Sequence, residues 1–332
     1  MKRKSFRVLI TGVGSTTAIS VIKGLRMQNE YDVFIVGVDI NDKDNIAGSK
    51  FCDKFFKIPP AIEEKKYINT LVEIITSESI DLLIPIIDIE LEIISQNINI
   101  LNKYTNVLIS PYETIIICND KYETYKFFSR IGVPTPKTLL LNTINDFDFD
   151  QIIQDLYSAG IDFPIIVKPR KGVSSRNVYE IYNKDELCLL RRVNEPIIQE
   201  KVEGQEYTID VFSDGKKVVS VVPRKRIEVR SGISYKGQTV KDPELIDYAK
   251  KIVEELKIIG PANIQCFKNE DDVKFIEINP RFSGSLPLTI AAGVNTPLFA
   301  LKMIAGENLK TVKNFKIVRM CRYWSEVFYY EN

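Results

Sequence analysis

The chain of 332 residues is long enough for two or three compact lobes, each with its own core. Its 45 Lys and Arg residues balance 44 Asp and Glu residues, and the net charge of +1 gives no general attraction to nucleic acid or to an anionic membrane. No apolar run reaches the roughly 18 residues of a membrane span, and the run after the basic start is too short for a secretory leader. The five cysteines are scattered singly, which predicts a reducing cytoplasm rather than a disulfide framework or a structural zinc site.

The sequence contains no histidine, and this restricts its chemistry. Ser-His-Asp and Cys-His catalysis are excluded within the chain, as are histidine-ligated metals. Acid–base chemistry must use Asp, Glu, Lys, Tyr, Cys or substrate groups. We expect any metal to be a hard cation held by oxygen atoms, with magnesium preferred and manganese as the alternative.

The first third of the chain alternates strand and helix patterns. Apolar runs without polar breaks predict buried strands, and stretches with helical spacing predict helices between them. This alternation predicts a doubly wound parallel sheet covered on both faces, in a domain of residues 1–111. In chain order, the predicted elements are strand 6–11, helix 16–28, strand 33–38, helix 67–77, strand 81–86, helix 88–101 and strand 107–110.

Residues 112–332 mix hairpins with helices, which is typical of α+β lobes with antiparallel sheets. Residues 142–150 are the most linker-like stretch, and a surface loop is the preferred interpretation for them. The predicted elements are helix 120–131, strands 161–167 and 177–182, helix 184–193, strand 196–200, a hairpin of 207–212 and 217–222, helix 243–256, and a second hairpin of 262–267 and 273–279.

The second hairpin collects oxygen-bearing side chains on one face. Residues two apart on a strand share a face, so Glu277 and Asn279 point the same way. A turn centred on Asp271 places Gln265 opposite Glu277, with Arg281 two residues beyond Asn279. A carboxylate between two amide oxygens suits magnesium, which takes few protein ligands, and one carboxylate can bridge two ions on a phosphate chain. Taken alone, the same pattern also fits a polar edge strand.

Two earlier segments have features that suit a nucleotide. Lys168 leaves the end of a buried strand and runs into a loop of small residues, 171–176, whose backbone amides can approach phosphates. Residues 197–207 place carboxylates where an apolar run changes into a turn. In such a segment, backbone groups could contact the edge of a purine, and a carboxylate could bind the ribose hydroxyls. The plain alternatives are a lysine snorkelling from a strand end and a charged connector.

Order and spacing together favour the nucleotide interpretation. The series Asn119-Asp120-Lys121, Lys168 with its loop, Glu200-Lys201-Val202 with Glu206, and Gln265 before Glu277-x-Asn279-x-Arg281 closely resembles the ATP-grasp superfamily. Segments 260–265 and 275–285 are most similar to the synthetase units of the carbamoyl phosphate synthase large subunit and to related amino-acid ligases. The resemblance implies a pre-ATP-grasp domain, 1–111, and a two-lobed ATP-grasp domain, 112–332, with a small ATP lobe of about 130–202 and a C-terminal lobe of about 203–332.

The resemblance also implies a role for each matching residue. Arg281 would neutralise charge on the transferred phosphoryl group, the loop 171–176 would close over the phosphates, and Glu206 would bind the ribose. The expected ATP-binding residues are Lys121, Lys168, Lys171, Gly172, Ser174, Ser175, Glu200, Lys201, Val202 and Glu206. The expected ligands of one or two magnesium ions are Gln265, Glu277 and Asn279.

Arg224 and Arg226 lie in a basic cluster that we expect between hairpin strands. Because the family places a phosphate-facing segment here, we interpret them as catalytic residues, with Lys168 and Arg281, that grip the acyl phosphate or an acidic substrate. The alternative is a solvated edge strand, in which basic side chains discourage aggregation.

The segment 12–17 begins as a dinucleotide fingerprint, with Asp39 at the end of the next strand, but Thr17 replaces the third glycine. An NAD-dependent dehydrogenase is therefore a rival interpretation, although it leaves the series from Lys168 to Arg281 unexplained. We interpret the glycines as a tight turn and helix start facing the central cleft, near the acceptor substrate. Asp88 and Glu90 also lie where such sheets bind ligands, with helix capping as an equal alternative.

We therefore expect a cytoplasmic, magnesium-dependent ligase that joins a small-molecule carboxylate to an amine through an acyl phosphate, releasing ADP and phosphate. The chain is too short for both halves of a carbamoyl phosphate synthase and shows no glutaminase segment. The alternatives are a carboxyphosphate- or carbamoyl phosphate-forming enzyme and a nucleotide-binding subunit without turnover. Neither nucleic acid nor a membrane is expected as a partner, and a homodimer is an open option.

Overall fold

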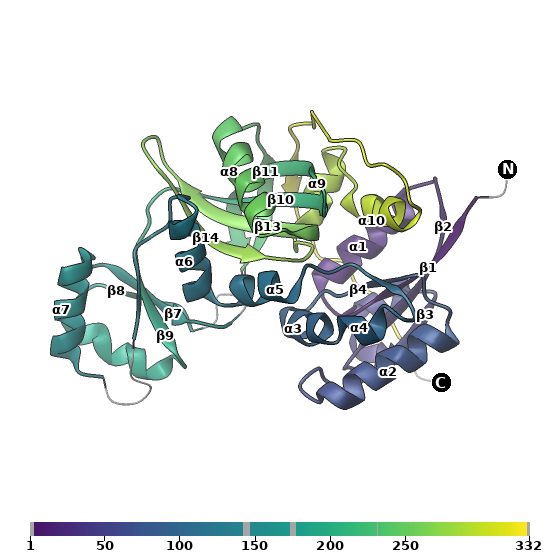
Figure 1. Cartoon of the computed structure of the whole chain (residues 1–332), viewed down its shortest axis with the longest axis horizontal. Helices are drawn as coiled ribbons and strands as arrows, with labels where there is room; N and C mark the ends of the chain where they lie inside the picture. The colour runs from purple at the N-terminus through teal and green to yellow at the C-terminus, as the bar shows by residue number, and fades with distance from the viewer. Residues whose placement is uncertain (1–2, 142–146, 173–176, 231, 331–332) are drawn as a thin grey trace.

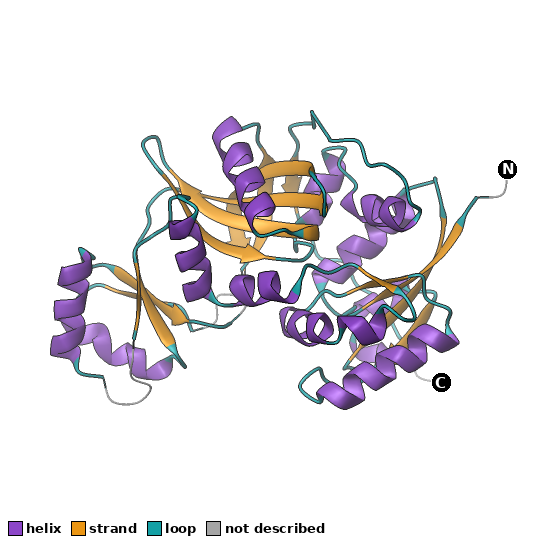
Figure 2. Ribbon diagram, viewed as in Figure 1, coloured by secondary structure: helices purple, strands orange, loops and turns teal. Residues whose placement is uncertain are grey.

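A computed structural model describes residues 3–141, 147–172, 177–230 and 232–330. Three sheets form its framework: a five-stranded sheet near the N-terminus, a small four-stranded sheet at the far end of the molecule, and a six-stranded sheet between them (Figures 1 and 2). No helix within these ranges is long and apolar enough to cross a membrane.

The N-terminal domain is a parallel sheet with helices on both faces. Its elements are β1 (Ser5–Ile10), α1 (Thr16–Met27), β2 (Asp32–Asp39), η1 (Lys43–Asn45), η2 (Ala47–Phe51), β3 (Lys54–Lys57), α2 (Glu64–Ser77), β4 (Leu82–Ile84), α3 (Asp88–Gln96), α4 (Ile98–Leu101) and β5 (Asn106–Val107). The strand order is β3-β2-β1-β4-β5. One core packs α1 on the sheet, and a second core packs α2 and α3 on the opposite face, so the strands are apolar on both sides.

The small lobe is a four-stranded antiparallel sheet with its own core. After α5 (Tyr112–Asn119) and α6 (Lys121–Arg130), its elements are β6 (Thr138–Leu140), α7 (Phe149–Ala159), β7 (Ile165–Pro169), β8 (Tyr179–Ile181), the 3₁₀ helix η3 (Lys184–Arg192) and β9 (Pro196–Glu200). The strand order is β6-β9-β7-β8. Apolar residues of α7 and η3 pack on this sheet, which places Lys168 near the end of the central strand β7.

The C-terminal lobe is a six-stranded antiparallel sheet that joins the other two parts. Its elements are β10 (Gln205–Asp214), β11 (Val218–Arg230), β12 (Ile233–Thr239), α8 (Pro243–Glu255), β13 (Ile259–Lys268), β14 (Val273–Asn279), α9 (Leu286–Ala291), α10 (Thr296–Ile304) and β15 (Arg319–Cys321). The strand order is β14-β13-β10-β11-β12-β15. Helices α5, α6 and α8 share one core with the sheet, while α9 and α10 pack with α1 of the N-terminal domain in another.

The predicted fold class is confirmed, with local differences. The predicted helix 88–101 is divided into α3 and α4, and the predicted helix 184–193 is a 3₁₀ helix over Lys184–Arg192. Eight strands and α-helices have no counterpart in the sequence interpretation: β3, α5, β6, α7, β12, α9, α10 and β15. Strand β3 is short, with a lysine at each end, and α5 contains three consecutive isoleucines, which favour a strand by propensity. Of the expected loop 142–150, residues 142–146 lie outside the described residues, and the last two residues begin α7.

The predicted position of the basic cluster was wrong. Arg224 and Arg226 lie inside β11, which pairs with β10 on one side and β12 on the other, and not between hairpin strands. Both side chains are buried, at 2% and 7% exposure. A solvated edge strand is therefore excluded for these two arginines, and each buried guanidinium needs a partner inside the protein.

Candidate active site

A cleft of about 660 Å³ opens where the three sheets meet. Its wall combines Lys168 from β7, Glu277 from β14 and Ser15 from the start of α1. Thus all three parts of the fold contribute to one site. The predicted site residues that line the cleft are Lys121, Lys168, Gly172, Glu200, Lys201, Val202, Glu206, Arg226, Gln265, Glu277, Asn279 and Arg281.

Four other predicted site residues are not among the lining residues. Ser174 and Ser175 lie outside the described residues. Lys171 is exposed, and its Nζ lies 3.9 Å from Glu92 Oε2. Arg224 is buried behind the cleft wall.

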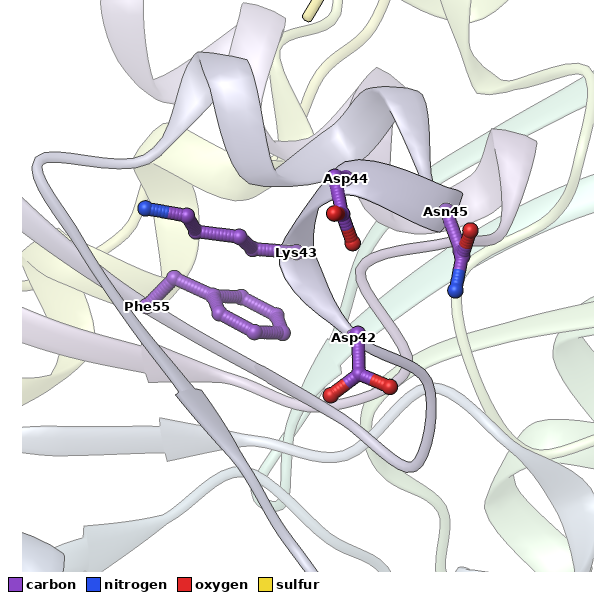
Figure 3. Close-up of a pocket in the computed structure, with 5 residues that line it drawn as sticks. All are labelled: Asp42, Lys43, Asp44, Asn45 and Phe55. Atoms are coloured by element: carbon purple, nitrogen blue, oxygen red, sulfur yellow. The ribbon is translucent and has the colours of Figure 1, made fainter. Parts of the chain in front are cut away.

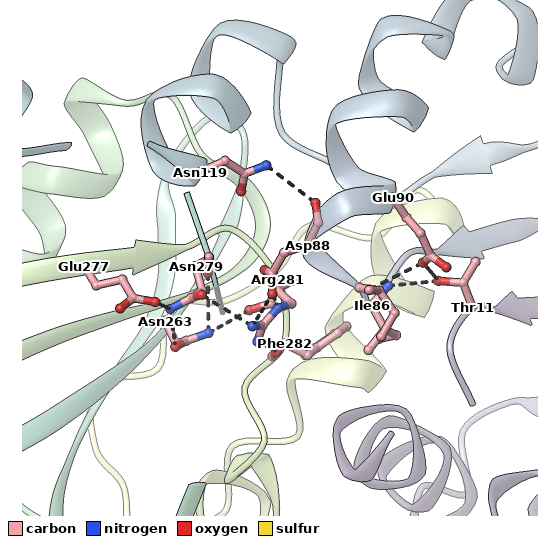
Figure 4. A network of polar contacts seen from close by, with 12 residues as sticks. Thr11, Ile86, Asp88, Glu90, Asn119, Asn263, Glu277, Asn279, Arg281 and Phe282 are labelled. Carbon is pink, nitrogen blue, oxygen red and sulfur yellow. Dashed lines mark hydrogen bonds and ion pairs between the residues drawn. The ribbon is translucent and has the colours of Figure 1, made fainter. Parts of the chain in front are cut away.

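The hairpin of β13 and β14 has the register that the sequence predicted. Gln265 is paired with Glu277 and Asn263 with Asn279, with a bulge after Gln265. The Asn279 Nδ2 atom donates a hydrogen bond of 3.0 Å to Glu277 Oε1, which orients the amide beside the carboxylate (Figure 4). Three oxygen-bearing side chains from two neighbouring strands therefore face the same cleft.

This donor set fits a hard cation. It offers one carboxylate and two amide oxygens and no sulfur or imidazole, which is oxygen chemistry of the kind that magnesium selects. The Glu277 Oε2 atom and the Gln265 side chain have no hydrogen-bond partner within the described part of the chain, so they are available as ligands. The described part of the chain contains no cluster of three or more acidic or cysteine side chains that could hold a metal. A cation here would need water or phosphate oxygens to complete its shell.

Lys168 faces this hairpin from the small lobe. It is only 7% exposed, and its Nζ donates a 2.8 Å hydrogen bond to Gln199 Oε1. Burial lowers the pKa of Lys168 to about 8, although the nearby Glu277 carboxylate acts in the opposite direction. Lys121 is a second cation on the cleft wall, and its Nζ donates a 2.8 Å bond to the Gly172 carbonyl. Two ammonium groups therefore lie on the wall opposite the oxygen donors.

The segment predicted to bind the adenosine also lines the cleft, and its charges are paired. Lys201 forms an ion pair with Glu180 of β8. Glu206 forms one with Arg226, and burial of this carboxyl raises the pKa of Glu206 while Arg226 opposes the rise. Glu200 Oε1 lies 3.8 Å from Lys274 Nζ.

The two arginines of β11 differ in their surroundings. Arg226 reaches the cleft and also donates a 2.7 Å bond from Nη2 to the Gly232 carbonyl. Arg224 forms an ion pair with Asp210 and donates a 3.0 Å bond to Ser283 Oγ, and burial lowers its pKa. The Arg224 guanidinium thus supports the cleft wall from behind, because Ser283 lines the cleft.

Arg281 has a partner that the sequence interpretation did not anticipate. Its guanidinium donates to both oxygens of Asp88 at the start of α3, at 2.7 and 2.8 Å, across 193 positions of the chain (Figure 4). The sequence predicts a ligand-binding or capping role for Asp88, and its carboxylate instead binds Arg281. The sequence contains no signal for the pair, because it forms only when the N-terminal domain packs against the C-terminal lobe.

The glycine turn after β1 faces the cleft as predicted, through Ser15, Thr16 and Thr17 at the start of α1. The Gly14 amide donates a 2.8 Å bond to Asp39 Oδ2, so this carboxylate is already occupied. A Cβ atom added at Gly14 would lie 2.9 Å from the Ile46 side chain, which covers the turn. The other Asp39 oxygen, Oδ1, accepts bonds from the Asn41 backbone and side chain. Both oxygens of the carboxylate that a dinucleotide fingerprint would offer to a ribose are therefore occupied, and this disfavours the dehydrogenase interpretation.

A second hollow, of about 480 Å³, lies on the N-terminal domain (Figure 3). It is lined by Asp42, Lys43, Asp44, Asn45 and Phe55, of which all but the phenylalanine are exposed. No residue of the predicted nucleotide series belongs to it.

Comparison with known proteins agrees with this architecture. Residues 192–324 match the family described as ATP-grasp in the biosynthetic pathway with Ter operon, and residues 8–108 match the PylC-like N-terminal domain family. The carbamoyl phosphate synthase large chain of Clostridium acetobutylicum is 26% identical over 223 residues, which are 61% of this chain and 20% of that protein. The chain thus spans about one fifth of the length of the curated relatives it matches.

Solved structures share the fold at low sequence identity. N5-carboxyaminoimidazole synthetase from Staphylococcus aureus, complexed with ADP, has a TM-score of 0.75 at 17% identity and covers 97% of this chain and 84% of its own. The biotin carboxylase domain dimer of Hydrogenobacter thermophilus 2-oxoglutarate carboxylase, with MgADP and bicarbonate, has a TM-score of 0.74 at 18% identity, with coverages of 95% and 74%. An L-amino acid ligase from Bacillus licheniformis has a TM-score of 0.67 at 16% identity, with coverages of 92% and 75%.

A parallel-sheet domain followed by two antiparallel lobes around a shared cleft is the architecture of an ATP-grasp protein. The chain belongs to the ATP-grasp superfamily, with a PylC-like N-terminal domain and a distant similarity to the carbamoyl phosphate synthase large chain. Enzymes of this family are ATP-dependent ligases.

Proposed function

We propose that the chain is an ATP-dependent ligase that joins a carboxylate to an amine through an acyl phosphate. The observation that carries this proposal is the cleft itself, in which Lys168 and Lys121 face an oxygen-donor hairpin centred on Glu277. Opposed ammonium and carboxylate groups suit a metal-bound triphosphate, because each wall neutralises one part of the complex. Similarity to an L-amino acid ligase supports the same reaction class.

The chemistry needs positioning rather than a histidine base. A carboxylate is a poor acyl electrophile, and phosphorylation by the γ-phosphate of ATP turns its oxygen into a good leaving group. The amine then attacks the acyl carbon, the acyl–oxygen bond breaks, and phosphate leaves. The protein holds the reactants in line and neutralises charge.

We assign the residues of the cleft to three tasks. Lys121, Lys168 and the backbone at Gly172 would hold the phosphates, while Arg281 would face the transferred phosphoryl group. The segment from Glu200 to Val202, with Glu206, would bind the nucleoside. Gln265, Glu277 and Asn279 would hold magnesium, which would neutralise charge on the phosphate oxygens. Arg226 would contact the acidic substrate, and we assign Arg224 a supporting task because it lies behind Ser283.

The acceptor would enter beside the N-terminal domain. Ser15, Thr16 and Thr17 line that end of the cleft together with Ile87. This surface presents hydroxyls and apolar groups, which would suit a small molecule rather than a polymer. A homodimer is part of the proposal only by analogy with the biotin carboxylase domain dimer, and light scattering would test it.

Mass spectrometry of ATP-dependent products from a pooled library of acids and amines tests the proposal. We expect a condensed product with loss of water, formed together with ADP. Glu277→Ala should lose turnover by about a hundredfold or more while remaining folded. Glu270→Ala is the matched control, because Glu270 is an exposed acid in the turn of the same hairpin.

Other outcomes separate the alternatives. ATP cleavage stimulated by bicarbonate without any amine would favour a carboxyphosphate-forming enzyme, as the similarity to carbamoyl phosphate synthase would allow. Nucleotide binding without product across the whole panel would favour a subunit without turnover. Full activity of Glu277→Ala would refute the metal assignment.

A further inference from the structure

The Arg281 guanidinium is held from outside its own lobe. Asp88 accepts hydrogen bonds from Arg281 Nε and Nη2, and both side chains are 18% exposed. Arg281 Nη2 also lies 3.4 Å from Asn279 Oδ1, so the guanidinium sits beside the proposed metal ligands. This bidentate pair fixes the plane of the guanidinium as well as its position.

The turn that presents Asp88 is itself anchored in the core of the N-terminal domain. The Ile86 amide donates a 3.0 Å bond to Thr11 Oγ1, and Thr11 Oγ1 donates a 2.5 Å bond to Glu90 Oε2. The Ile87 amide also points to Glu90 Oε2, at 3.4 Å. Figure 4 shows the contacts around Thr11, Ile86 and Glu90 on one side and the Asp88–Arg281 pair on the other. The backbone that leads into Asp88 is thus held by buried side chains.

Asn119 holds the same turn from the other side. Asn119 is the last residue of α5, and its Nδ2 atom lies 3.5 Å from the Asp88 carbonyl (Figure 4). Side chains from the residue after β1, from α3 and from α5 therefore all restrain the peptide units around Asp88.

We propose that Asp88 is a positioning residue that holds Arg281 away from Glu277, and that the Thr11–Glu90 pair holds Asp88 in place. This inference rests on the proposed function, because that function assigns Glu277 to the metal. The contacts of Asp88 and Arg281 do not depend on it. The Asn279 amide lies between Arg281 and Glu277: its Oδ1 atom is 3.4 Å from Arg281 Nη2, and its Nδ2 atom donates a 3.0 Å bond to Glu277 Oε1. Glu277 is therefore a carboxylate only one side chain away from this guanidinium.

The consequence concerns the metal site. If Asp88 is neutralised, the partly buried guanidinium still favours an anionic partner, and Glu277 is the available one. A guanidinium bound to Glu277 would compete with a cation for the same oxygen atoms. Asp88 thus keeps the Glu277 carboxylate open, although it touches no metal ligand itself.

Nitrogen-15 NMR of the free protein with labelled arginine tests the geometry without any turnover. The Arg281 Nε–H signal is the one that disappears in Arg281→Lys. In Asp88→Asn we expect this signal to shift and its exchange with solvent to accelerate by about tenfold or more, because a charge-assisted bond is lost. Thr11→Val should move the same signal by a smaller amount. Asp53→Asn is the control, since it removes an ion pair with Arg26 away from the cleft.

Binding of Mn²⁺ in the presence of ADP, followed by electron paramagnetic resonance, tests the consequence. Asp88→Asn should weaken Mn²⁺ binding by about tenfold, while ADP binding without metal changes by less than about threefold. An unchanged Arg281 signal in Asp88→Asn, or unchanged Mn²⁺ affinity, would overturn the proposal. Failure of every form, wild type included, to bind ADP would instead refute the proposed function, and the NMR result would still decide the geometry.

Discussion

The buried ammonium group of Lys168 should make nucleotide binding depend on pH in a defined direction. Burial lowers its pKa to about 8, so the free protein carries this charge at pH 7 and has largely lost it at pH 9. Bound phosphates favour the charged form, and binding above pH 8 must therefore be accompanied by proton uptake. One pH unit above the pKa, about one tenth of the protein retains the proton. The affinity for MgADP should then fall about tenfold between pH 7 and pH 9, or about 1.4 kcal/mol.

Isothermal titration calorimetry with MgADP measures this dependence directly. Lys168→Met should bind more weakly and show no such fall, because it has no proton to lose. Lys168→Arg is the informative partner variant, since a guanidinium stays charged over the whole range and should also remove the fall. The reasoning is refuted if wild type and Lys168→Met show the same pH dependence.

Two stability predictions follow from buried charges elsewhere. Burial raises the pKa of Glu90 from 4.5 to about 7. The contribution of this side chain to the free energy of unfolding is therefore most favourable below about pH 4.5 and is lost as the pH rises through 7. In urea unfolding, the stability of wild type relative to Glu90→Gln should fall by about 2.5 kcal/mol between pH 5 and pH 8. A constant difference between the two proteins would contradict this. Arg224→Met leaves Asp210 buried without its cation and should cost about 3–5 kcal/mol, whereas Arg224→Met with Asp210→Leu should recover much of the loss. Equal stability of the single and double variants would show that the buried pair is not the cause.

The Glu90 carboxyl also has charged and polar neighbours on several elements. Asp39 of β2 raises its pKa further, whereas the bond from Thr11 lowers it. The buried Tyr67 hydroxyl of α2 lies next to Glu90 and, like Thr11, lowers the pKa of this carboxyl. Burial outweighs the favourable bonds, and this imbalance gives the sign of the predicted pH dependence.

Local patterns were sufficient to predict the oxygen-donor hairpin. The period of two along a strand put Glu277 and Asn279 on one face, and the turn length put Gln265 opposite Glu277, as the observed register confirms. The position of Lys168 near the end of a buried strand was also predictable, because the apolar run of that strand ends just before this residue.

Contacts between distant segments were not predictable from the sequence. Arg281 meets Asp88 where the N-terminal domain packs against the C-terminal lobe, which includes the contact of α1 with α9 and α10. Arg224 was expected to act on substrate, but its place in a central strand turns it toward Asp210. A basic run in the sequence shows that these residues are charged. It does not show which residues lie beside them in the sheet, because the order of the strands determines those neighbours.

The central claim is that the β13–β14 hairpin holds the cation of a nucleotide whose phosphates face Lys168. Anomalous diffraction from crystals grown with ADP and Mn²⁺ tests it most directly. The account predicts a manganese peak at the carboxylate of Glu277 and the amide oxygen of Asn279, with the ADP phosphates between this peak and Lys168. A nucleotide bound at the glycine turn of residues 12–17, or a manganese peak away from the hairpin, would contradict it.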